Sequence, residues 1–153
     1  MSAAHTPVML REVLEWLRVK PDGTYIDATL GAGGHSEAIA RKLTSGRLIS
    51  LDRDAQALAM ARERLKTFGP KVTVVQAAFS RIAEAAQELG ILPVDGVLAD
   101  LGVSSMQLDN AERGFSFREA GPLSMRMGIS VESEQSELTA DEIVNRWRSE
   151  ERV

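Results

Sequence analysis

The residues best suited to chemistry are glycines and carboxylates placed where strands are expected to end. The segment from Asp27 to His35, Asp-Ala-Thr-Leu-Gly-Ala-Gly-Gly-His, follows a β-prone run and precedes an expected helix. Glycines permit a sharp turn and let a ligand approach the backbone. The first N–H groups of a helix are free to bind a polar or negative ligand. The segment is therefore a candidate ligand loop, although a tight turn without a ligand is an alternative.

The spacing of these glycines distinguishes between two nucleoside cofactors, a dinucleotide and S-adenosyl-L-methionine. A dinucleotide fingerprint that starts at Gly31 needs a glycine at position 36, where the chain has Ser36. Asp27 lies four positions before Gly31. A carboxylate there would repel a pyrophosphate, but it can face the ammonium group of S-adenosyl-L-methionine, directly or through water. We therefore expect this methyl donor as the cofactor, with Asp27 and Gly31 among its contacts.

Asp52 ends the next expected strand, 21 positions after Gly31. A carboxylate there can accept hydrogen bonds from both ribose hydroxyls, an arrangement that nicotinamide and S-adenosylmethionine sites share. Asp52 thus supports an adenosine ligand without choosing between them.

Strands and helices are expected to alternate through the first hundred residues. We predict helices over 7–18, 36–43, 54–67 and 80–89, and strands over 24–28, 47–52, 71–76 and 94–100. This alternation is typical of a parallel sheet with helical crossovers. The predicted fold is α/β: a Rossmann-like class I S-adenosylmethionine-dependent methyltransferase domain with a partial sheet of four strands in the order 3-2-1-4, flanked by helices. Residues 101–137 look irregular, and Thr139–Glu142 is expected to start a last helix.

Composition narrows the class of protein. The chain has 153 residues, about one domain, with no cysteine and only two histidines. No zinc site is expected and the chemistry needs no metal, although carboxylates could hold magnesium. It has no apolar run of the roughly 18 residues that span a bilayer and no targeting segment, so a cytoplasmic protein without a membrane partner is expected. The net charge of −4 argues against a self-sufficient nucleic-acid binder.

Several segments together resemble the RsmH/MraW family, which methylates N4 of a cytidine in the decoding region of small-subunit (16S) ribosomal RNA. The segments are His5–Met9, Gly31–His35, Leu51–Asp54, Phe79-Ser80, Asp100–Asp109, Glu112–Arg118 and Gly121–Leu123. The resemblance implies that Gly33, Gly34, His35, Asp52, Phe79, Asp100 and Gln107 contact S-adenosylmethionine. The chain departs from the family pattern at Ser124 and Gly128, where family members usually carry acidic residues. Family members are also much longer than this chain.

Asp100 is the candidate catalytic residue. It follows the fourth expected strand, at the carboxyl edge where open α/β sheets place ligands. The exocyclic amine of cytosine is a poor nucleophile because its lone pair is delocalised into the ring. A carboxylate that accepts hydrogen bonds from the amine turns this lone pair towards the methyl group, and backbone carbonyls near Leu101 and Gly102 could assist. A strand-end cap without a chemical role is the alternative.

The segment after Asp100 carries the candidate substrate contacts. Arginines there could bind phosphates and aromatic rings could stack on an extruded base. The candidates are Ser104, Ser105, Arg113, Phe115, Phe117 and Arg118. The expected partner is the small ribosomal subunit with its 16S rRNA. A solvated loop of mixed charge is an equal alternative for the arginines.

The domain organisation predicted is an incomplete cofactor-binding domain over 1–128 and the start of a truncated helical substrate-recognition insertion over 129–153. An uncovered apolar strand at 97–99 would be an aggregation liability. A fragment, a truncated product or completion by a partner, including a homodimer, would each account for it. Besides a methyltransferase, the functional alternatives are a cofactor-binding module without activity and, less favoured, an NAD-dependent oxidoreductase.

Overall fold

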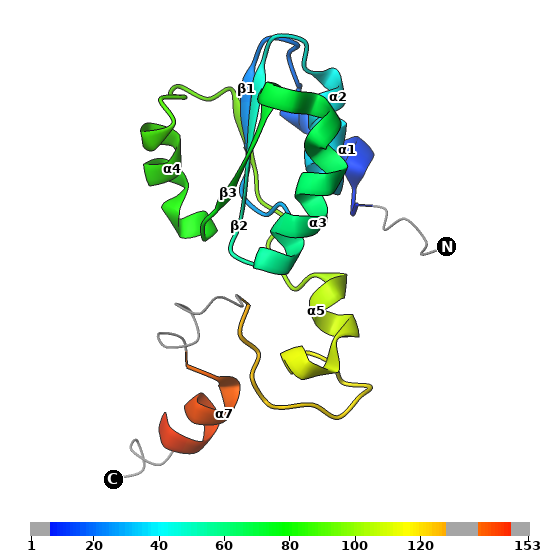
Figure 1. Ribbon diagram of the computed structural model, residues 1–153, viewed down its shortest axis with the longest axis vertical. Helices are drawn as coiled ribbons and strands as arrows, with labels where there is room; N and C mark the ends of the chain where they lie inside the picture. The colour runs from blue at the N-terminus through cyan, green and yellow to red at the C-terminus, as the bar shows by residue number, and fades with distance from the viewer. Residues whose placement is uncertain (1–6, 128–137, 148–153) are drawn as a thin grey trace. The chain divides into compact units, whose positions relative to one another are not determined.

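The computed structural model describes residues 7–127 and 138–147 (Figure 1). The chain divides into two compact units, Met1–Leu101 and Gly102–Val153. Each unit is described by itself. The assignment of cofactor binding to 1–128 and of substrate recognition to 129–153 stays a prediction.

The first unit is built on a parallel sheet. Its strands are β1 (Thr24–Asp27), β2 (Arg47–Asp52), β3 (Val72–Gln76) and β4 (Gly96–Leu98), in the order β3-β2-β1-β4. Ile26 of β1 lies between Ile49 of β2 and Val97 of β4. The predicted strand order is confirmed, and among the described residues β4 pairs on one side only.

Helices cover both faces of this sheet. Helices α1 (Leu10–Leu17), α2 (Gly34–Lys42) and α3 (Ala55–Leu65) lie on one face and α4 (Ile82–Glu88) on the other (Figure 1). Two 3-10 segments, η1 (Lys66–Lys71) and η2 (Phe79–Arg81), lead into β3 and α4. The alternation that the sequence predicts is therefore present.

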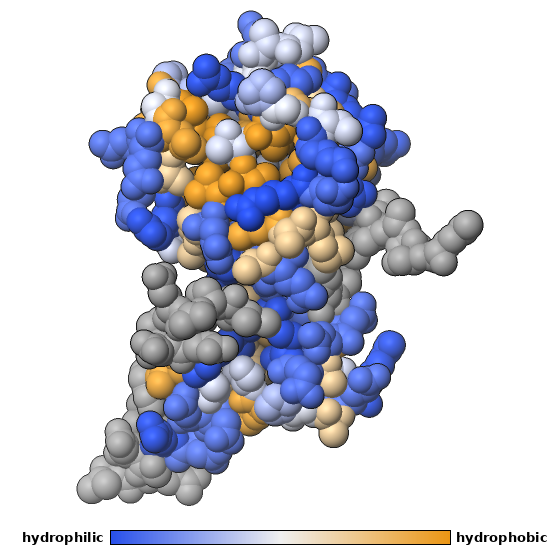
Figure 2. Space-filling view, viewed as in Figure 1, coloured by the Kyte–Doolittle hydropathy of each residue, from blue (hydrophilic) through white to orange (hydrophobic). Residues whose placement is uncertain are grey.

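The core has two layers because neighbouring strand residues point to opposite faces. The buried residues towards α4 are Ile26, Ile49, Leu51, Ala85, Ala86 and Ile91, and those towards α1 and α2 are Tyr25, Ile39, Ala40, Leu43 and Leu48. At the β3 edge, apolar side chains remain visible between α3 and α4 (Figure 2). Val72, Val74 and Val75 are only half-buried there.

Two details of the first unit differ from the predictions. The strand expected over 94–100 is shortened to Gly96–Leu98. The Asp95 carboxylate accepts hydrogen bonds from the Thr24 N–H and from Lys20 Nζ, so this residue caps the strand instead of extending it. The helix predicted over 7–18 is shortened to Leu10–Leu17, and its Trp16 is 81% exposed.

The second unit contains two short helices where the sequence looked irregular, α5 (Ser105–Asp109) and η3 (Ala111–Arg113). The helical segments α7 (Ala140–Glu142) and η4 (Ile143–Trp147) lie where a last helix is predicted. A capping box starts α5: Ser104 Oγ accepts from the Gln107 N–H, and Gln107 Oε1 accepts from the Ser104 N–H. The predicted capping start at Thr139 is confirmed by the same arrangement with Glu142.

Candidate functional site

The candidate residues of the first unit follow the carboxyl ends of neighbouring parallel strands. The glycine loop follows β1, Asp52 is the last residue of β2, Phe79 follows β3 and Asp100 follows β4. Parallel strands bring their carboxyl ends to one edge of the sheet, and open α/β sheets bind ligands there.

The three glycines of the loop have different tasks. Gly31 has φ 51° and Gly33 φ 81°, in the left-handed region that favours glycine. A Cβ at Gly33 would lie 3.3 Å from Ala61 Cβ, and one at Gly34 would lie 2.3 Å from Pro7 Cγ, so both positions allow close packing. A Cβ at Gly31 would meet nothing within 4 Å. The loop is therefore packed closely against Ala61 and Pro7 at Gly33 and Gly34, and it has free space at Gly31.

Asp52 is bound to this loop. Its Oδ2 accepts a hydrogen bond of 2.8 Å from the Gly31 N–H, and its Oδ1 accepts one of 2.9 Å from the Asp54 N–H. Each carboxylate oxygen keeps a second lone pair, so the half-buried side chain can still accept from two ribose hydroxyls.

Helix α3 braces the loop from the side. Arg64 Nε donates to Glu37 Oε2 at 2.6 Å, and Arg64 Nη1 donates to the Ala32 carbonyl at 3.2 Å. Hydrogen bonds from Arg41 and Arg64 hold the pKa of Glu37 below its usual range. The start of α2 is thus fixed to α3 by an ion pair as well as by the Gly33–Ala61 contact.

Asp27 lies beneath the loop and is completely buried. Its Oδ1 accepts from the Thr29 N–H at 3.1 Å, and its Oδ2 accepts from Ser36 Oγ at 2.6 Å. Ser36 Oγ is in turn 2.7 Å from Ser50 Oγ. Burial raises the pKa of Asp27, although the bonds from Ser36 and Thr29 oppose this. The geometry gives Asp27 a role inside the turn, and its contact with a cofactor ammonium group stays a prediction.

Asp100 is tied to the same loop. Its backbone N–H donates to Thr29 Oγ1 at 2.7 Å, and its Oδ2 lies 3.8 Å from His35 Nε2. The carboxylate side chain is 54% exposed, whereas that of His35 is 9% exposed. His35 Nδ1 is buried and has no hydrogen-bond partner among the described residues.

Three residues of this arrangement are not predicted from the sequence: Thr29, Ser36 and Ser50. Ser50 carries a weak signature, since it is a hydroxyl inside the apolar strand Leu48–Leu51. Thr29 carries none, because its partner Asp100 lies 71 positions further along the chain.

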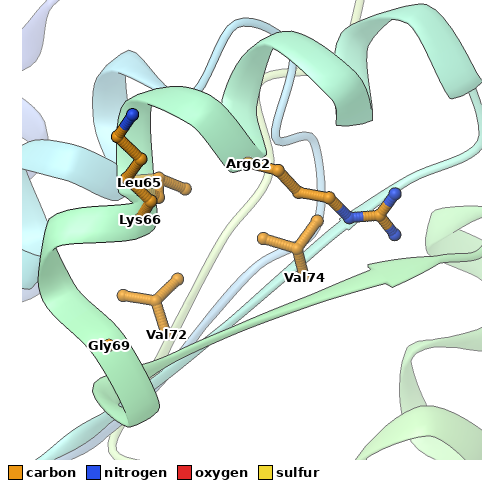
Figure 3. Close-up of a pocket in the computed structure, with 6 residues that line it drawn as sticks. All are labelled: Arg62, Leu65, Lys66, Gly69, Val72 and Val74. Atoms are coloured by element: carbon orange, nitrogen blue, oxygen red, sulfur yellow. The ribbon is translucent and has the colours of Figure 1, made fainter.

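Phe79 is 55% exposed and lies in η2, three residues after the end of β3. A shallow groove of about 210 Å³ lies elsewhere, between the end of α3 and the start of β3 (Figure 3). Its lining residues are Arg62, Leu65, Lys66, Gly69, Val72 and Val74. The groove is therefore not at the edge that carries the candidate residues, while the place of Phe79 is compatible with the predicted contact to the cofactor.

The other candidates belong to the second unit. Gln107 is buried within the α5 capping box, and its Nε2 donates to the Met127 carbonyl. Arg113 is 5% exposed and donates to the carbonyls of Arg126 and Met127. Their predicted roles, cofactor contact for Gln107 and phosphate contact for Arg113, are not tested by these bonds and stay predictions.

The remaining substrate candidates differ in exposure. Phe115 is buried, whereas Phe117 and Arg118 are exposed. Ser104 is the capping residue of α5, and the side chain of Ser105 lies outside the described residues. Among the candidates whose side chains are described, Phe117 and Arg118 are the exposed ones, and substrate contact stays a prediction for all five.

Within residues 7–127 and 138–147, no helix is long and apolar enough to cross a bilayer, and no cluster of three or more histidine or acidic side chains could hold a metal ion. For S-adenosylmethionine the residues fit: open space at Gly31, free lone pairs on Asp52 and an unpartnered buried nitrogen on His35.

The fold is that of a Rossmann-like class I S-adenosylmethionine-dependent methyltransferase. A Clostridium thermocellum protein described as an rRNA-methylase superposes with a TM-score of 0.53 at 20% identity, over 67% of this chain and 58% of that one. The C-terminal domain of precorrin-6Y C5,15-methyltransferase from Rhodobacter capsulatus gives a TM-score of 0.51 at 21% identity, over 71% and 56%. At these identities the likeness establishes the fold.

The chain belongs to the MraW methylase family, because the sequence model of that family matches residues 2–153. It is 48% identical over 152 residues to ribosomal RNA small subunit methyltransferase H from Symbiobacterium thermophilum, and 47% identical to the protein of that name from Brevibacillus brevis. The matches cover 99% of this chain but only 46% and 47% of those proteins, so the chain spans about half their length. The predicted family and fold are confirmed, and S-adenosyl-L-methionine is the cofactor they imply.

Proposed function

We propose that this chain is the cofactor-binding part of an S-adenosylmethionine-dependent methyltransferase that modifies N4 of a cytidine in the decoding region of small-subunit ribosomal RNA. The observation that carries the proposal is the placement of the glycine loop, Asp52 and Asp100 at one sheet edge in a member of the MraW methylase family. The names of its curated relatives support ribosomal RNA as the substrate.

The loop and the strand ends bind the cofactor. The open side of Gly31 receives it, Asp52 accepts hydrogen bonds from the ribose, and the exposed ring of Phe79 faces the adenine. Asp27 acts from below by holding Thr29 and Ser36 in place. The free N–H groups at the start of α2 add a positive potential towards the polar end of the ligand.

Asp100 acts on the substrate amine. S-adenosyl-L-methionine, when bound, supplies a methyl group activated by its positively charged sulfur. The half-exposed Asp100 carboxylate accepts hydrogen bonds from the exocyclic N–H groups and so directs the nitrogen lone pair towards the methyl carbon. As the N–C bond forms and the C–S bond breaks, the same carboxylate takes the proton that the amine loses. Alignment of the two reactants supplies most of the acceleration.

The RNA partner is the small ribosomal subunit. With a net charge of −4, the chain offers little general attraction for phosphates. The exposed Phe117 and Arg118 of the second unit are the best placed candidates for a stacked base and a phosphate.

Binding is tested by calorimetry of the chain with S-adenosylmethionine, S-adenosylhomocysteine and NAD. We expect both adenosyl compounds to bind and NAD to bind much more weakly. Tighter binding of NAD would overturn the proposal in favour of an oxidoreductase.

Methyl transfer is tested on small ribosomal subunits that lack the modification. We expect N4-methylcytidine in the decoding region, and a fall in rate of about 10²-fold or more for Asp100→Ala. Binding without transfer by this chain would favour the alternative of a cofactor-binding module, and unchanged transfer by Asp100→Ala would remove the catalytic role of that residue.

A further inference from the structure

Asp100 stands two residues beyond the end of a very short strand, in a place where little regular structure holds it. Strand β4 ends at Leu98, and the Leu98 carbonyl accepts the last ladder bond from the Ala28 N–H at 2.8 Å. Beyond that point the backbone of Asp100 is held by one side chain, because its N–H donates to Thr29 Oγ1 at 2.7 Å. The position of the carboxylate therefore depends on Thr29.

Thr29 is itself fixed from below. Its N–H donates to Oδ1 of the fully buried Asp27 at 3.1 Å, and Asp27 is held by Ser36 at 2.6 Å. A β-branched side chain such as threonine has few χ1 rotamers. The hydroxyl that receives the Asp100 N–H is thus anchored to the interior of the first unit.

His35 lies beside the carboxylate of Asp100. Its Nε2 lies 3.8 Å from Asp100 Oδ2, and its ring is too buried to swing freely. If Nε2 carries the proton and faces the carboxylate, Nδ1 is left as an acceptor. The buried Nδ1 without a partner among the described residues matches this arrangement.

We propose that Thr29 and His35 are positioning residues for Asp100: Thr29 sets the backbone and His35 the carboxylate. They couple the cofactor loop after β1 to the reactive end of β4, so that a change at the hydrogen-bonded Thr29 or at the neighbouring His35 alters the position of the Asp100 carboxylate. The inference rests on the proposed function for its effect on the ligand, but the hydrogen bond from Asp100 to Thr29 can be tested without it.

The test compares Thr29→Val, which keeps the shape and removes the acceptor, with Thr29→Ser, which keeps the hydroxyl. Thr73→Val, at an exposed position of β3, is the matched control. Hydrogen exchange of the Asp100 amide is expected to be about three- to tenfold faster in Thr29→Val and near wild type in Thr29→Ser. Where Thr29→Val does not fold, Thr29→Ala is compared with Thr29→Ser, because these two differ only by the hydroxyl.

Affinity for S-adenosylhomocysteine gives the second readout. We expect a loss of about three- to tenfold for Thr29→Val, recovery in Thr29→Ser, and no further loss when Thr29→Val is added to Asp100→Ala. We expect His35→Leu to weaken the binding of S-adenosylhomocysteine more than His35→Gln does, because a glutamine amide can donate a hydrogen bond towards the Asp100 carboxylate and a leucine cannot.

The outcomes separate the two proposals. Failure of the wild-type chain to bind S-adenosylhomocysteine would count against the proposed function, while the amide exchange would still decide the link from Thr29 to Asp100. An Asp100 amide that stays protected in Thr29→Val, or an equal loss of affinity in the Asp100→Ala background, would overturn the role of Thr29. Equal losses for His35→Leu and His35→Gln would overturn that of His35.

Discussion

Three aspartates at the edge of one sheet have three environments and therefore three roles. Asp27 is completely buried among hydroxyl groups, Asp52 is half-buried with a bond from the backbone to each oxygen, and Asp100 is largely exposed. The sequence predicts all three as cofactor contacts. The structure makes Asp27 the one best placed to act through its neighbours, since it alone of the three is completely buried and both of its oxygens accept hydrogen bonds within the turn.

The buried Asp27 has a consequence for stability. Burial raises its pKa above the unfolded value of 3.8. The folded chain then binds this proton more tightly than the unfolded chain, so the contribution is fully present below pH 3.8 and is lost as the pH rises through the folded pKa. We expect the free energy of unfolding of the wild type, relative to Asp27→Asn, to decrease as the pH rises above 3.8. Urea unfolding of both proteins over a pH series measures this difference.

The control is Asp22→Asn, which changes an exposed aspartate in the turn before β1. Its difference from the wild type should not show the same decrease with pH. A difference between wild type and Asp27→Asn that stays constant, or grows with pH, would contradict the account of the buried carboxylate.

At the scale of elements, the sequence predicts what depends on local pattern and fails where a distant partner decides. The strands and helices of the first unit are found in the predicted order, because apolar periodicity and glycine stops are local properties. The start of β4 is not predicted, since Asp95, the residue before it, is held by contacts to Lys20 and Thr24, 75 and 71 positions away. The helix α5 could have been found from Ser104 and Gln107, which form a visible capping pattern.

Helix α3 offers a test of how an element supports the site. Asp54 is its N-cap, with Oδ1 accepting from the Gln56 N–H at 2.9 Å, and it is 4% exposed. Asp54→Ala should lower the free energy of unfolding by about 1 kcal/mol, because the N–H loses its acceptor. Chemical denaturation measures the change, and Asp22→Ala serves as the exposed control. An unchanged midpoint and slope for Asp54→Ala would show that α3 does not depend on its cap.

At the scale of the whole molecule, the exposed sheet edge at β4 is the feature that bears on self-association. Among the described residues β4 pairs with β1 alone, and Val97 on it is 48% exposed. The relatives that this chain matches are about twice its length, since it covers 46% and 47% of them. An exposed apolar edge strand is a template for pairing with another chain, so self-association of the 153-residue chain is expected to run through β4.

Val97→Lys tests that expectation. A lysine on an edge strand opposes edge-to-edge pairing, so we expect the variant to remain monomeric at concentrations where the wild type forms larger species. Light scattering over a concentration series measures this. The substitution changes the net charge from −4 to −3, and a net charge closer to zero by itself favours association. A gain in monomer therefore has to come from the strand edge.

Thr73→Lys carries the same charge on the opposite edge strand, β3. If it works as well as Val97→Lys, pairing is not specific to β4; if neither variant differs from wild type, the edge plays no part.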